Sequence, residues 1–188
     1  MDTQTLVIVV LALALVAALG WILYDRRRSA ALRSRFGPEY RRVVDEADDR
    51  RAAESELEAR QRRVDKLDIR PLPEAERDRY AAEWKAVQAH FVDEPAAAIS
   101  EADRLIGGVM EAQGYPVADF EQRAADVSVD HPRVVEHYRA AHAIATTEAE
   151  PDATTTTEDL RQAMVHYRAL FEDLLGMGKA EPHQRKAV

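Results

Sequence analysis

The sequence contains no cysteine and no asparagine among its 188 residues. Without cysteine, the chain has no disulfide framework, no thiolate nucleophile and no thiolate ligand for a metal ion. Without asparagine, it has no acceptor for Asn-linked glycosylation. Lysine is scarce, so arginine carries most of the positive charge, and alanine is abundant. We interpret the arginine and alanine content as that of a GC-rich bacterial protein, and the absence of cysteine fits a reducing environment.

Recognisable catalytic and cofactor motifs are also missing. No Gly-x-Ser-x-Gly nucleophile elbow, His-Glu-x-x-His zinc motif or Glu-x-x-His di-metal motif occurs in the sequence. Ser128, Asp130 and His131 have the residue types of a hydrolase triad, but a triad is assembled from separated segments. The histidines of residues 131–142 lack metal-ligand spacing. We therefore expect no catalytic residue, no cofactor and no metal, with an enzyme of unrecognised type as the remaining alternative.

The longest hydrophobic run extends from Leu6 to Tyr24 and contains no charged residue. As a helix it would span about 28 Å, close to the roughly 30 Å hydrocarbon core of a bilayer. Backbone amides in lipid need internal partners, so a single spanning segment has to be helical. Asp2 is the only charged residue before the run, where a signal peptide would carry positive charge. The run therefore predicts an uncleaved transmembrane anchor over residues 1–24.

Basic residues follow the hydrophobic run instead of preceding it. By the positive-inside rule, they predict an N-terminus outside the cell membrane and a C-terminal part in the cytoplasm. Nucleic-acid binding is the other interpretation, but these residues adjoin the membrane segment and the whole chain has a net charge of −8. We expect no nucleic-acid partner and assign this end of the run to the membrane interface. The interface residues are Trp21, Tyr24, Arg26, Arg27 and Arg28.

Residues 25–68 have the composition of a basic juxtamembrane segment followed by a charged helical stalk. Gly37 interrupts the pattern, and Pro38 suits the first turn of a new helix. From there to residue 68 the residues favour one long helix, whose sparse apolar positions make a poor coiled-coil seam. Two prolines then force an extended stretch at residues 69–73, where we place the start of the globular part.

The globular part, residues 69–176, has one apolar stripe in each of its main helical segments. A single amphipathic helix is not stable alone, so the segments predict an all-α fold, a small antiparallel helical bundle. Residues 177–188 have the composition of a disordered tail. The stripe of the first helix consists of Tyr80, Trp84, Val87 and Phe91, at i, i+4, i+7 and i+11.

Helix ends in the globular part are predicted from capping and turn residues. Asp93 and Asp130 are predicted N-caps, each with a proline two residues later. Gly114 stops one helix, and Asp119 caps the short helix that follows. Residues 127–129 are predicted to form either a short strand or a buried turn.

Arginine and histidine are concentrated between Phe120 and Ala145, and again in the last helix. A helix with one buried stripe leaves the rest of its surface to solvent, so part of this charge is exposed. We expect the surface that recognises a protein partner, or a second copy of the chain, to lie there. The candidate interaction residues are Arg123, His131, Arg133, His137, Arg139, His166 and Arg168.

Three segments resemble a group of actinobacterial proteins with one N-terminal membrane helix and a helical soluble region. The resemblance extends over nearly the whole chain and keeps the order of the segments. It implies no activity, cofactor or catalytic residue, because none is known for that group. The segments are FGPEY at Phe36–Tyr40, FEQRAADVSVDHPRVVEHYRAAHAI at Phe120–Ile144 and DLRQAMVHYRALFEDLL at Asp159–Leu175.

These features favour a membrane-anchored, non-enzymatic cytoplasmic module that binds a protein partner or a second copy of itself. A second hypothesis is a ligand-binding or sensory bundle, with a small molecule near Trp84, Tyr138 and His142. A filled core with an exposed apolar patch would favour the first hypothesis, and a sizeable apolar pocket would favour the second.

Overall fold

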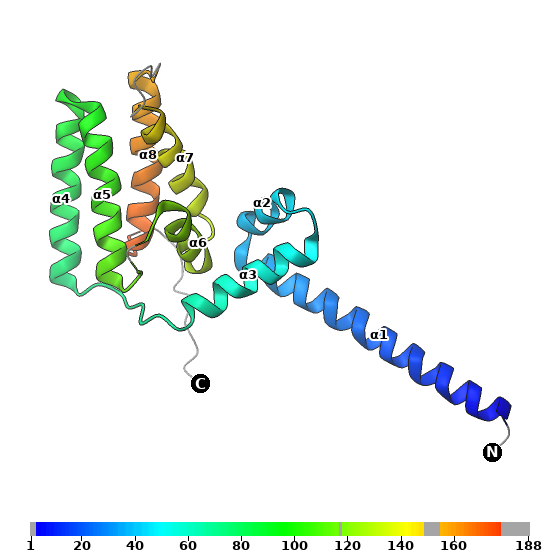
Figure 1. Ribbon diagram of the computed structural model, residues 1–188. Coiled ribbons are helices and arrows are strands. Elements are labelled where there is room, and N and C mark those ends of the chain that lie inside the picture. Colours follow the sequence, from blue (N-terminus) through cyan, green and yellow to red (C-terminus); the bar gives the residue numbers. More distant parts are fainter. Residues whose placement is uncertain (1–2, 117, 149–154, 178–188) are drawn as a thin grey trace. The chain divides into compact units, whose positions relative to one another are not determined.

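The computed structural model describes residues 3–116, 118–148 and 155–177. The side chains of residue 3 and of residues 5–10 also lie outside the description. The described residues form eight helices and no strand, which confirms the all-α prediction (Figure 1). The helices are α1 (Thr3–Phe36), α2 (Pro38–Glu46), α3 (Arg50–Val64), α4 (Glu74–Asp93), α5 (Pro95–Gln113), α6 (Phe120–Asp130), α7 (Val135–Glu148) and α8 (Thr157–Leu174).

The chain divides into two compact units, residues 1–58 and residues 59–188. The first unit contains α1, α2 and the larger part of α3, and the second contains the helices from α4 onward. The predicted boundary between residues 68 and 69 lies in the connection between α3 and α4, which belongs to the second unit.

The apolar interior of the first unit comes from one face of each of its helices. α1 continues beyond Tyr24 to Phe36, and its last turns bury Leu32 and Phe36 at i, i+4 spacing. α2 buries Tyr40 and Val43, and α1 and α2 pack against each other. α3 adds the buried side chains of Ala53 and Leu57.

Buried carboxylates also belong to the interior of the first unit. The Tyr40 hydroxyl donates a hydrogen bond to the Glu54 carboxylate at 2.7 Å, and the Arg50 guanidinium lies 3.5 Å from it. Burial opposes ionisation of Glu54, but its hydrogen bonds and the charge of Arg50 outweigh burial and lower its pKa. Glu39 accepts two hydrogen bonds from Arg42, at 2.9 and 2.7 Å. Each carboxylate therefore has at least one hydrogen-bond donor and one arginine beside it.

The prediction of one long helix between residues 38 and 68 is wrong. α2 ends at Glu46, and α3 begins at Arg50 after a break at residues 47–49. The Asp49 carboxylate accepts a hydrogen bond from the backbone N–H of Ala52 at 3.3 Å, so it caps the start of α3. The break allows the sparse apolar residues of α2 and α3 to be buried in one unit, whereas a single straight helix would leave them exposed.

α1 also carries the predicted transmembrane run. Among the described residues, no helix is both long enough and apolar enough to cross a membrane. Residues 6–10 belong to the run, and their side chains lie outside the described part of the chain. The transmembrane helix therefore stays a prediction.

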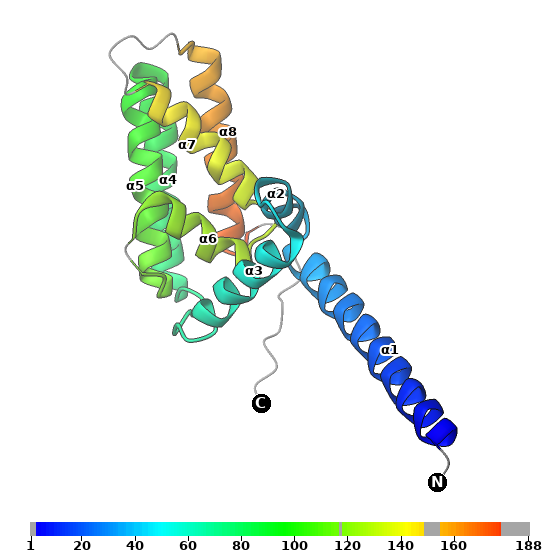
Figure 2. The same cartoon turned by 45° about the vertical axis from the view of Figure 1, so that its right-hand side comes forward.

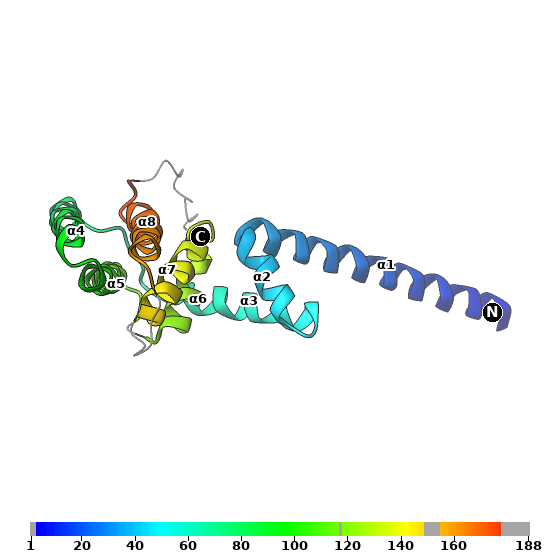
Figure 3. The same cartoon turned by 90° about the horizontal axis from the view of Figure 1, so that it is seen from above.

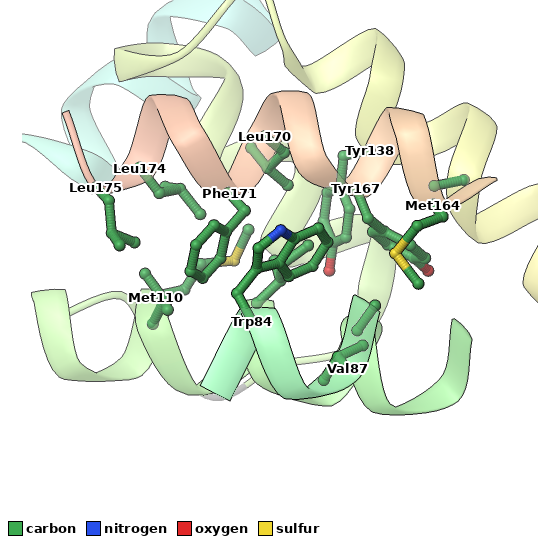
Figure 4. Packing of buried hydrophobic residues seen from close by; sticks show 14 of the residues in the cluster. Trp84, Val87, Met110, Tyr138, Met164, Tyr167, Leu170, Phe171, Leu174 and Leu175 are labelled. Carbon is green, nitrogen blue, oxygen red and sulfur yellow. The ribbon is translucent and has the colours of Figure 1, made fainter. Parts of the chain in front are cut away.

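In the second unit, α4, α5, α8 and α7 lie side by side in that order (Figure 1). The short α6 packs against α7 and lies across the lower part of the bundle in Figure 2. Figure 3 views α4, α5 and α8 nearly along their axes. The apolar stripes meet in one shared core, in which the rings of Trp84 and Phe171 stack with centroids 4.7 Å apart (Figure 4). This arrangement agrees with the predicted helical bundle.

Gly114 and Asp119 delimit helices as predicted. Gly114 has a φ of 103° at the end of α5, a left-handed conformation that favours glycine. A Cβ at this position would lie 2.4 Å from the carbonyl oxygen of Asp68, so the connection before α4 also requires glycine here. The Asp119 carboxylate accepts a hydrogen bond from the backbone N–H of Gln122 at 2.9 Å and so caps α6.

The prediction that Asp93 and Asp130 are N-caps is wrong, because they are the last residues of α4 and α6. α6 is also helical through residues 127–129, where a strand or a turn was predicted. Helical spacing buries Ala124 and Val127 together in the core. This apolar burial outweighs the local preference of an aspartate before a proline for a capping position.

Replacing Phe171 with alanine is expected to lower the free energy of unfolding by about 3–5 kcal/mol, because the ring is buried against Trp84. Val165→Ala is the control on the same helix, since 47% of Val165 is exposed and its effect should stay within about 0.5 kcal/mol. Equilibrium denaturation of the full chain in detergent measures both values. Equal effects of the two substitutions would contradict this packing of α8.

Candidate functional site

The candidate interaction residues lie on or beside α6, α7 and α8, but they do not all come together. The histidines line the contact between α7 and α8. Arg123 and Arg139 lie instead beside carboxylates of α5 and α6. Arg133 and Arg168 are exposed, and Arg168 pairs with Glu172 of its own helix at 2.7 Å.

His137 of α7 and His166 of α8 form a pair across the contact between these helices. Their Nδ1 atoms are 2.9 Å apart, and their ring centroids are 5.0 Å apart. The distance from each ring centroid to its own Nδ1, added to the distance between the two nitrogens, is close to the distance between the centroids. The two nitrogens therefore point at each other. A hydrogen bond between them requires one ring to donate and the other to accept. The pair can therefore keep its hydrogen bond with at most one positive charge.

His131 makes a second contact along the same line. Its Nδ1 lies 2.5 Å from Oδ2 of Asp173 in α8, and this contact ties the junction between α6 and α7 to α8. His166 and Asp173 are seven residues apart, so they lie on one face of α8, two turns from each other. We call His131, His137, His166 and Asp173 the histidine seam.

A polar cluster that the sequence analysis missed surrounds Asp103 of α5. The Tyr167 hydroxyl of α8 donates a hydrogen bond to the Asp103 carboxylate at 3.0 Å. Arg123 of α6 and His142 of α7 lie 4.0 and 3.9 Å from this carboxylate. Gly107, one turn after Asp103, was the residue in the sequence that could have indicated this cluster. A Cβ on Gly107 would lie 3.0 Å from Nη1 of Arg123, so the glycine makes room for the guanidinium.

Three polar atoms of this cluster are buried without a hydrogen-bond partner within the described ranges. They are Tyr138 Oη, His142 Nδ1 and Arg123 Nε. Burial raises the pKa of Tyr138 and lowers the pKa of His142. The His142 ring also stacks on Phe120, with centroids 3.6 Å apart. Both Tyr138 and His142 are therefore uncharged at neutral pH.

The contacts around Asp103 join neighbouring helices of the second unit. Nδ1 of His142 and Oδ1 of Asp103 are 3.9 Å apart, whereas a base is oriented by a hydrogen bond of about 2.6–3.2 Å. The negative charge of Asp103 is balanced by Arg123. The hydrogen bond from Tyr167 and the charge of Arg123 therefore link Asp103 of α5 to α8 and α6, whereas His142 of α7 lies nearby without a hydrogen bond to it.

A hollow of about 260 Å³ lies between α7 and the start of α8. Trp84, Tyr138 and His142, which were predicted near a ligand site, are not part of its lining. Within the described ranges, no group of three or more histidine, aspartate or glutamate side chains is placed to hold a metal ion. The hollow is lined by Ala143, Ile144, Thr147, Thr155 and Asp159.

The predicted membrane-interface residues lie on α1, and most of them are exposed. Trp21 and Tyr24 are 64% and 68% exposed, and Arg26 and Arg27 are exposed too. Arg28 differs, because its guanidinium pairs with the Glu58 carboxylate of α3. The small side chains of α1 between residues 11 and 24 are exposed, and so are the large apolar ones, namely Leu11, Leu13, Leu15, Val16, Leu19, Ile22 and Leu23.

Comparison of the chain with protein family models, with curated proteins and with solved structures finds no match. The resemblance to actinobacterial membrane proteins therefore stays a prediction. The function has to be inferred from the residues of this chain alone.

The pair of His137 and His166 is expected to make stability depend on pH. Burial and the neighbouring His137 lower the pKa of His166 in the folded chain, so the unfolded chain binds a proton more readily. The resulting stability is present above about pH 6.5 and is lost as the pH falls below that value. His166→Gln keeps a hydrogen-bonding group that does not titrate, so it should reduce the loss of unfolding free energy on acidification.

Urea denaturation of the full chain in detergent, at about pH 7.5 and about pH 5.5, measures this change. His90→Gln is the control with the opposite sign, because a hydrogen bond to Glu101 raises the pKa of His90. Replacing His90 should make the free energy of unfolding fall more steeply on acidification. A pH dependence that His166→Gln leaves unchanged would contradict the role of the pair.

Proposed function

We propose that this chain is a membrane-anchored, non-enzymatic helical module that binds a protein partner, or a second copy of itself, at the cytoplasmic face of the cell membrane. The observation that carries the proposal is the apolar surface of α1, which is exposed on all sides from Leu11 to Tyr24. Contiguous exposed apolar surface of this kind marks contact with a membrane or a partner.

Lipid is the covering that fits the whole hydrophobic run best. The run from Leu6 to Tyr24 has the length of a bilayer core, and side chains on every side of the helix are apolar. A protein partner would cover one side of a helix, whereas lipid surrounds it. The proposal takes the run as a whole, including residues 6–10, whose side chains lie outside the described part of the chain.

The exposed residues at the end of the run support the proposed orientation. Trp21 and Tyr24 have rings that suit the headgroup region, and Arg26 and Arg27 follow within one turn. Under the positive-inside rule, this order supports an N-terminus outside the cell and the part of the chain after the hydrophobic run in the cytoplasm.

The second unit supports an interaction role more than a ligand-binding role. Its buried apolar side chains form one cluster, and the hollow of about 260 Å³ between α7 and α8 is smaller than typical ligand pockets of roughly 300–1,000 Å³. The polar groups that reach its surface include Arg133, Arg168 and the histidine seam. We place the contact with the partner there.

Leu15→Arg is expected to prevent stable insertion, because Leu15 lies at the middle of the run and arginine costs about 2.5–3.5 kcal/mol at a helix centre. Extraction of cell membranes with alkaline carbonate measures the fraction that stays inserted. Val92→Arg is the control, since Val92 is 81% exposed at the end of α4. A wild-type chain that is fully extracted would contradict the anchor.

Charge reversal at Arg133 and Arg168 is expected to remove crosslinks through α7 and α8, because these exposed arginines flank the histidine seam. Crosslinking of the tagged full chain in native membranes, followed by mass spectrometry, identifies the partner and the crosslinked residues. The double substitution Arg77→Glu and Arg104→Glu is the control, since both residues are exposed on α4 and α5. Identical crosslinks in the two double variants would argue against this surface.

A further inference from the structure

We infer that Arg26 and Arg27 form a binding site for the phosphate groups of anionic phospholipids. The inference rests on the proposed anchor and concerns the single helical turn that follows it. The headgroup layer is roughly 5–8 Å thick on each side of the hydrocarbon core. At about 1.5 Å per residue, a helix crosses that layer in roughly three to five residues. After Tyr24, this turn consists of residues 25–28.

Two of the charged residues in this turn are neutralised inside the first unit. The Arg50 guanidinium of α3 donates to the Asp25 carboxylate at 3.1 Å. Arg28 binds the Glu58 carboxylate through two nitrogens, with Nη2 and Oε2 2.8 Å apart. Both pairs join α1 to α3, so neither Asp25 nor Arg28 is available to a lipid. Because Asp25 is already paired, it does not neutralise the positive charges of Arg26 and Arg27.

Arg26 and Arg27 have the opposite surroundings. Both side chains are exposed, and neither takes part in an ion pair within the described ranges. The next turn on this side of α1 consists of Ala30 and Ala31, which are also exposed. These small side chains leave the two guanidinium groups open to a ligand.

A phosphate is the ligand that best matches two free guanidinium groups at this depth. A guanidinium binds phosphate oxygens through two parallel hydrogen bonds, and its long stem reaches along the apolar boundary. In a zwitterionic lipid, the negative charge of the phosphate is balanced by the positive group of the same lipid. In phosphatidylglycerol it is not balanced. We therefore expect a preference for the anionic lipid of roughly fivefold for each arginine.

Trp21, which precedes Arg26 by five residues in the same helix, provides a reporter close to the site. The chain has two tryptophans, and Trp84→Phe leaves Trp21 as the only one. The full chain is placed in phosphatidylcholine vesicles with a minor fraction of phosphatidylglycerol. In one sample the phosphatidylglycerol carries brominated acyl chains that quench tryptophan, and in the other the phosphatidylcholine does. When Arg26 and Arg27 are present, each brominated phosphatidylglycerol molecule should quench Trp21 more strongly than each brominated phosphatidylcholine molecule.

The double substitution Arg26→Gln and Arg27→Gln should abolish this preference, while brominated lipids of both kinds continue to quench Trp21. Arg77→Gln with Arg104→Gln is the matched control, because it makes the same charge change at exposed positions of α4 and α5. The control should keep the preference. The lipid composition that copurifies with the chain containing Trp84 gives a second readout that does not depend on the Trp84→Phe background.

Equal quenching by the two lipids in the wild type, or a preference that survives the double substitution, would overturn the inference but leave the anchor intact. Absence of quenching by either lipid would overturn the anchor as well. Loss of the preference on addition of inorganic phosphate would overturn the lipid assignment in favour of a site for free phosphate.

Discussion

Burial of the apolar face of α8 is the interaction on which the second unit depends. α8 packs against α5 and α7, and the stacking of Phe171 on Trp84 joins α4 to the same core. The polar contacts follow from this packing, because Tyr167, His166 and Asp173 project from α8 toward partners on neighbouring helices. The unit is therefore organised around one helix, with its polar links arranged about an apolar centre.

α1 differs from α8, because much of its apolar surface is exposed in the described structure instead of buried. The part of α1 after Tyr24 is different, because Leu32 and Phe36 are buried in the first unit and Arg28 pairs with Glu58. One continuous helix therefore joins the surface that we assign to lipid with the interior of the first unit. Under the proposed function, the anchor and the buried end of α1 belong to the same helix.

The sequence predicts the features of this protein that depend on local pattern. The stripe that includes Trp84, the left-handed end of α5 at Gly114 and the cap at Asp119 all follow from the spacing or chemistry of neighbouring residues. The break between α2 and α3 could not be predicted in this way, because it depends on burial of apolar residues from separate helices. The extension of α6 to Asp130 has the same origin.

The candidate site was predictable only in part, for a related reason. The sequence placed His137 and His166 on the candidate surface, but spacing within one helix cannot indicate that two rings on different helices meet. Asp103 was missed because a single carboxylate at the edge of an apolar stripe resembles an ordinary exposed residue. Its partners come from α6, α7 and α8, and only the packing of these helices brings them together.

The depth of α1 in a bilayer is the measurement that tests the account most directly. Because the chain has no cysteine, single spin labels can be placed at Leu15, Leu19, Ala30 and Ser34 of the full chain in vesicles. Labels at Leu15 and Leu19 are expected to be reached by oxygen and shielded from a water-soluble nickel complex, whereas labels at Ala30 and Ser34 are expected to be reached by the nickel complex. Access of the nickel complex to all four positions would contradict the membrane anchor.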